Sequence, residues 1–62
     1  MKPETRKLLI AMLESQLKIE NQKFLELDRM WEADGSNVMP YYRTVGAAIN
    51  EIKRQLEELK GE

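Results

Sequence analysis

The feature that most constrains the fold of this chain is the spacing of apolar residues in two long segments. In the second half, apolar residues recur at intervals of 3, 4, 3, 4 and 3 residues. This spacing places their side chains on one face of a helix, as in the seam of a coiled coil. The residues of this second-half seam are Tyr42, Val45, Ile49, Ile52, Leu56 and Leu59.

A matching seam occupies the first half and contains one charged member. Its residues are Ile10, Leu13, Leu17, Glu20, Phe24, Leu27 and Trp31. Asp34, Gly35, Ser36 and Asn37 separate the two seams, and short polar and glycine-containing stretches are typical of turns. The pattern predicts an all-α, single-domain antiparallel two-helix hairpin spanning residues 1–62. We expect helices at about 3–34 and 39–60 and a turn at 35–38.

Three residues are predicted to have special positions in this hairpin. Pro3 is expected to open the first helix, because proline is favoured at the first helical position. Gly35 is expected to end that helix in the left-handed conformation. Glu20 is expected to lie opposite Lys53, where a polar residue in a seam fixes the register of the two helices.

The small size of the chain predicts that it needs a second chain for stability. A 62-residue chain rarely obtains more than roughly 3–5 kcal/mol from one hydrophobic core. It contains no Cys and no His, which excludes disulfides and the usual structural zinc sites. The remaining source of additional stability is self-association or docking on another protein. A homodimer is the favoured form, in which two hairpins make a four-helix bundle.

The first predicted helix carries more apolar residues than one neighbouring helix can cover. In the predicted register the second helix ends opposite about Leu13, so the apolar residues before Leu13 extend past it. Two further apolar residues lie beside the seam rather than on it. A wide apolar stripe requires two neighbours. The residues expected to bind a second copy or another protein here are Leu8, Leu9, Ile10, Met12, Ile19 and Met30.

Large side chains also gather around the predicted turn. Trp31 and Tyr41 lie there together with Met30 and Met39. Aromatic residues and Met are enriched in protein interfaces, and they also close the ends of helical bundles. Closure of the bundle end is the favoured interpretation, and Trp31 and Tyr41 are also kept as candidate association residues. Gly46 is expected to permit close approach of the two helices.

The composition argues against enzymatic activity. The absence of His and Cys removes the commonest general base and the thiol nucleophile. Asp28 and Glu32 share one helix face, but a divalent cation requires several convergent oxygen ligands, and a solvated acidic face is the simpler interpretation. No catalytic, cofactor or metal site is predicted.

The charge balance does not favour a general nucleic-acid-binding protein. Ten basic and eleven acidic residues give a net charge of −1, whereas phosphate binding requires a basic surface. A local basic patch could still make such contacts through Arg6, Lys7, Arg29 and Arg43. No apolar run reaches the length of a membrane span, and residues 1–14 do not fit a secretion signal, so a cytoplasmic location is expected.

The sequence predicts a protein that acts by binding. The leading function is a small non-enzymatic protein-binding regulator or co-chaperone that acts through helical faces. One alternative is a dimeric RNA- or DNA-binding protein, for which the net charge gives no support. Another alternative is a structural oligomerisation module. The predicted partners are a second copy of the chain, another protein, or both.

Overall fold

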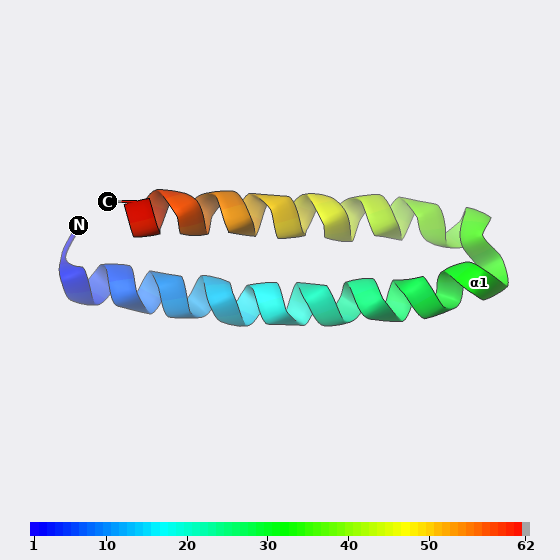
Figure 1. The fold of residues 1–62 in the computed structure, drawn as a ribbon, viewed down its shortest axis with the longest axis horizontal. Helices are drawn as coiled ribbons and strands as arrows, with labels where there is room; N and C mark the ends of the chain where they lie inside the picture. The colour runs from blue at the N-terminus through cyan, green and yellow to red at the C-terminus, as the bar shows by residue number, and fades with distance from the viewer. Residues whose placement is uncertain (62) are drawn as a thin grey trace.

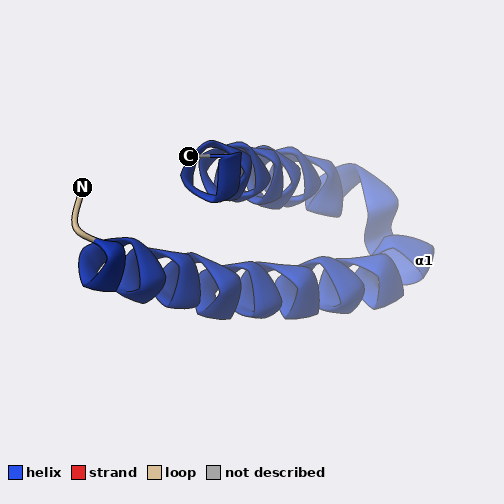
Figure 2. Cartoon of the chain, turned by 60° about the vertical axis from the view of Figure 1, so that its left-hand side comes forward, coloured by secondary structure: helices blue, strands red, loops and turns tan. Residues whose placement is uncertain are grey.

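The computed structural model describes residues 1–61 and consists of one helical element. The element α1 runs from Pro3 to Gly61, and within it only Asp34 departs from helical backbone angles, with φ −157° and ψ 65°. No loop separates residues 35–38 from the helix on either side (Figure 2). The predicted hairpin of two separate helices joined by a four-residue turn is therefore wrong, and so is the four-helix bundle built on it. The all-α class is confirmed. Glu62, the last residue of the predicted domain, lies outside the described residues.

The helical element bends back on itself at Asp34. A straight helix of 59 residues would be about 88 Å long at 1.5 Å per residue, whereas the longest Cα dimension of the chain is 47 Å. Figure 1 shows the two ends of the chain on the same side of the molecule. We call residues 3–33 the first arm of α1 and residues 35–61 the second arm. Near the open end, Lys60 Nζ lies 3.6 Å from Glu14 Oε2, which joins the two arms.

The bend uses Asp34 in place of the expected glycine. Asp34 precedes the second arm as a helix N-cap would, and Asp is among the residues preferred at that position. Its Oδ2 accepts a hydrogen bond of 2.9 Å from Asn37 Nδ2, one turn further on. Gly35 has no positive φ, so the predicted left-handed conformation is wrong. The reversal requires one non-helical residue before a new helix start, and Asp supplies this without left-handed backbone.

The core lies along the facing seams of the two arms. The buried apolar residues are Val38, Ile49, Ile52 and Leu56, all in the second arm. Three of them belong to the predicted second-half seam. Val38 was placed in the turn by the sequence pattern, but the helix continues through it and adds it to the seam four residues before Tyr42. Seam residues of the first arm, such as Leu13, Leu17 and Leu27, are half-buried.

Three aromatic rings pack near the bend. The ring of Tyr42 meets Trp31 edge-on at a centroid distance of 5.4 Å. The same ring meets Phe24 edge-on at 4.7 Å. Edge-to-face contacts of this kind contribute about 0.5–1.5 kcal/mol each beyond the area that they bury. Tyr42 therefore holds the two arms together over two turns of the first arm.

Glu20 and Gly46 have different roles from those that the sequence predicted. Glu20 is buried, but its Oε1 accepts hydrogen bonds from Gln16 at 3.0 Å and Lys23 at 3.2 Å, both in its own arm, rather than pairing with Lys53. A Cβ atom added at Gly46 would have no neighbour within 4 Å. Gly46 therefore does not mark a close approach of the arms, as the sequence suggested.

Candidate functional site

The most prominent surface feature is a second apolar face on the first arm. Four large side chains on it are 51–67% exposed. They are separated by four, seven and eleven residues, which are close to whole numbers of helical turns, so they share one face. This face is distinct from the seam that contacts the second arm. We call it the outer stripe, and its residues are Leu8, Met12, Ile19 and Met30.

The outer stripe leads into a groove between the arms close to the bend. This groove, which we call the Met30 groove, has a volume of about 530 Å³. Most of its exposed wall is apolar, although Lys23 and Glu26 are among the lining residues. It lies beside Tyr41, which is 64% exposed. The lining residues are Lys23, Glu26, Leu27, Met30, Asn37, Val38, Tyr41 and Val45.

The structure divides the predicted association residues into three groups. Leu8, Met12, Ile19 and Met30 form the outer stripe, and Tyr41 adjoins its groove. Leu9 and Ile10 are half-buried. Trp31 is 39% exposed and lines a different hollow with Met39, Tyr42 and Arg43. The outer stripe and Tyr41 thus form one candidate surface, whereas Trp31 belongs to the packing at the bend.

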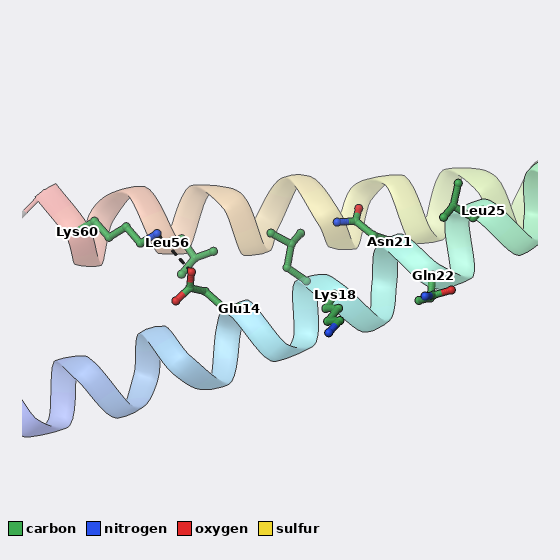
Figure 3. A pocket seen from close by; sticks show the side chains of 8 residues that line it. Glu14, Lys18, Asn21, Gln22, Leu25, Leu56 and Lys60 are labelled. Atoms are coloured by element: carbon green, nitrogen blue, oxygen red, sulfur yellow. Dashed lines mark ion pairs between the residues drawn. The ribbon is translucent and has the colours of Figure 1, made fainter.

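A second groove between the arms, near the open end, has a polar character. Figure 3 shows Glu14 and Lys60 reaching toward one another across it, with Lys18, Asn21 and Gln22 along its first-arm wall. Its volume is about 370 Å³. Leu25 is its exposed apolar residue, at 57%. Because this groove is bounded by charged and amide side chains, it is less suited than the outer stripe to binding an apolar helix.

The structure does not gather the four predicted nucleic-acid contacts on one face. Arg6 is half-buried, and its backbone N–H donates to the carbonyl oxygen of Lys2 at 3.0 Å. Lys7 and Arg29 are exposed but lie 22 residues apart, about 33 Å along the helix. Arg43 is in the second arm, in the hollow with Trp31. These positions do not make a continuous basic surface of the kind that tracks a phosphate backbone.

The strongest charge cluster lies on the exposed side of the second arm. Arg54 donates hydrogen bonds to the carboxylates of Glu51 and Glu58, one turn away on either side. The Arg54 guanidinium lowers the pKa of Glu51 below its ordinary value of 4.5, chiefly through these hydrogen bonds. The two carboxylates in turn raise the pKa of Arg54. The cluster is fully exposed and intrahelical, so it stabilises the helix surface and does not form a site.

Within residues 1–61, no group of three or more metal-ligating side chains is close enough together to hold an ion. Asp28 and Glu32, considered above as a pair, are both exposed. In the same part of the chain, no helical segment has both the length and the apolar character required to cross a membrane.

Sequence reasoning missed two residues of these surfaces. Val38 forms part of the Met30 groove, and the signal for it was present, because it extends the second seam by one step. Leu25 is an exposed apolar residue at the polar groove. The sequence did not indicate Leu25, because no apolar residue lies three or four positions from it on that helix face.

Comparisons with known proteins returned no match: no family model, curated protein or solved structure resembles the chain.

Proposed function

We propose that this chain is a small non-enzymatic regulator or co-chaperone that binds protein through the outer stripe. The single observation that supports this is the exposure of Leu8, Met12, Ile19 and Met30, at 51–67%, along one helix face. Large exposed apolar side chains that share one helix face fit a protein-binding surface better than apolar residues scattered singly over the surface. The fitting partner is an amphipathic helix, which presents apolar residues at the same spacing.

The energetics favour a bound state of this surface. Complete burial of a Leu, Ile or Met side chain contributes about 1.5–3 kcal/mol relative to exposure. The four residues of the outer stripe each retain at least half of their exposure in the single chain. A partner helix would remove much of this surface from water, and the Met30 groove would accept a side chain at the end of the stripe. A cytoplasmic location, expected from the sequence, belongs to the same proposal.

Site-specific photo-crosslinking in cells that express the protein tests this function. A photoreactive benzoyl-phenylalanine replaces Ile19 in the outer stripe, and mass spectrometry identifies what it captures. The matched control places the same group at Leu25, in the same arm and with similar exposure (57% against 51%). We expect Ile19 to capture protein, either a second copy or another chain, and Leu25 to capture much less. Equal capture from both positions, or none from Ile19, would contradict the proposal.

A further inference from the structure

Three of the four residues of the outer stripe are spaced symmetrically about Ile19. Leu8 precedes Ile19 by eleven residues and Met30 follows it by eleven. Eleven residues make about three helical turns and span about 16.5 Å, so the three side chains stay on one face of the first arm. An interface between two identical chains related by a two-fold axis must be self-complementary in this way, because residue i of one copy meets residue j of the other and the reverse. Leu8, Ile19 and Met30 meet this condition with Ile19 on the axis, whereas Met12 has no apolar counterpart.

A two-fold axis at Ile19 would place Leu8 of one copy beside Met30 of the other. Met30 borders the Met30 groove, whose volume is about 530 Å³ and whose walls include Leu27, Val38 and Tyr41. Leu8 is 66% exposed in the single chain and would be covered there. The pairing therefore brings an exposed apolar side chain to an apolar hollow at both ends of the stripe.

The pairing places one carboxylate of this face opposite an apolar residue, but it brings no like charges together near the axis. In the same arrangement Met12 of one copy faces Glu26 of the other, and Ser15 faces Lys23. Near the axis, no charged residue faces a residue of the same charge in the other copy. Such a contact between like charges would be destabilising. Lys23 is already paired within its own arm with Glu20, at 3.2 Å.

The chain exposes more surface than a compact monomer of its mass, and this excess is close to the area that each partner buries in a typical interface. The accessible surface is 4943 Å² for a mass of 7.3 kDa. A compact monomer of this mass exposes about 4,200 Å². The excess of roughly 750 Å² is close to the roughly 800 Å² that each partner buries in a standard protein interface. A standard interface with one more copy would therefore remove from each chain about as much surface as this excess.

We propose that two copies of this chain associate antiparallel through their outer stripes, with Ile19 on the two-fold axis and Leu8 of each copy at the Met30 groove of the other. This inference rests on the proposed function, because it names a second copy as the protein that the outer stripe binds. The single chain leaves this surface open, and the symmetric spacing of Leu8, Ile19 and Met30 is what selects an identical partner over an unrelated one.

Sedimentation equilibrium of the full chain tests the association. We expect the wild-type mass to approach twice 7.3 kDa with rising concentration, and Ile19→Glu to halve it, because two like charges would meet on the axis. Leu25→Glu is the matched control and should keep the wild-type mass, with circular dichroism confirming that both variants remain helical. A wild-type mass of 7.3 kDa at all concentrations overturns the inference. So does an equal response of the two variants.

Single-cysteine variants test the geometry, because the wild-type chain has no cysteine. Under mild oxidation Ile19→Cys should form a disulfide-linked dimer, and Leu25→Cys should not. A mixture of Leu8→Cys and Met30→Cys should cross-link one variant to the other, whereas Leu8→Cys alone should form no disulfide-linked dimer. Self-linked Leu8→Cys would indicate a parallel arrangement and overturn the proposed one. If the purified chain stays monomeric while Ile19 still captures another protein in cells, this inference fails and the proposed function stands.

Discussion

The two arms of α1 differ in how completely they bury their apolar residues. The second arm buries Val38, Ile49, Ile52 and Leu56 to 7–8% exposure, and its exposed large apolar residues, Met39 and Tyr41, both lie near the bend. The first arm has no apolar residue buried to that extent. Its large exposed apolar side chains extend along its whole length: Leu8, Met12, Ile19, Leu25, Met30 and Trp31.

The difference shows that one neighbouring helix satisfies the second arm but not the first. A helix with a single apolar stripe can bury it against one partner, and the second arm has this pattern. The first arm has its seam toward the second arm and the outer stripe on another face, so its apolar surface needs two neighbours. The proposed binding surface follows from this unequal distribution.

The largest expected effect is on the free energy of unfolding, when an isoleucine of the seam and one of the outer stripe are each replaced by alanine. Ile49 is 8% exposed and Ile19 is 51% exposed. Ile49→Ala should lower the free energy of unfolding by about 2–5 kcal/mol, because it removes buried methyl groups and leaves a cavity. Ile19→Ala, measured where the chain is monomeric, should change it by less than about 0.5 kcal/mol. Urea denaturation followed by circular dichroism measures both, and equal losses would show that the two arms are equivalent.

A smaller effect is expected at the buried charge of the first arm. Lys23→Met removes one of the hydrogen bonds to the Glu20 carboxylate, which is buried, and should lower the free energy of unfolding by about 1–2 kcal/mol. Lys18→Met is the control, since Lys18 is exposed and borders the polar groove. Thermal denaturation of both variants checks the difference. A Lys23→Met protein as stable as the control would mean that Gln16 alone satisfies Glu20.

The two internal glycines should respond differently to alanine. A Cβ at Gly46 meets no atom within 4 Å, so Gly46→Ala should stabilise the helix by about 0.5–1 kcal/mol. A Cβ at Gly35 would lie 3.2 Å from Trp31 Cε2, which requires the indole ring to shift. Gly35→Ala should therefore gain less than Gly46→Ala, or lose stability. Denaturation midpoints measure the ranking, and the reverse order would contradict the packing of Trp31 against the bend.

The smallest effect concerns pH and the exposed side of the second arm. The pKa of Glu51 is lower in the folded chain than its ordinary value of 4.5, mainly because Arg54 donates hydrogen bonds to its carboxylate. The stabilisation is therefore present above that ordinary value and is lost as the pH falls through the lowered pKa. Arg54→Gln should raise the pKa of Glu51 toward 4.5 in an NMR titration, with Arg29→Gln in the first arm as control. An unchanged Glu51 pKa would show that the pair is absent in solution.

The sequence alone indicated which residues face inward. The all-α class and the burial of Ile49, Ile52 and Leu56 follow from the 3-4 spacing, because that spacing places side chains on one helix face whatever the helix packs against. The contact of Trp31 with Tyr42 was also predictable, since both lie on the seams on either side of the only stretch rich in turn residues. The width of the apolar face on the first arm was visible in Leu8, Met12 and Ile19.

Only the tertiary structure decided how the chain reverses and where each polar group finds its partner. Turn residues such as Gly35 and Ser36 are compatible with a loop or with a helix start, and local propensity does not choose between them. Packing of Trp31 against Gly35 and the bond from Asn37 to Asp34 favour continued helix with one non-helical residue. Likewise, Glu20 could pair across the arms or within its own. The choice of Gln16 and Lys23 depends on side-chain distances that residue spacing does not specify.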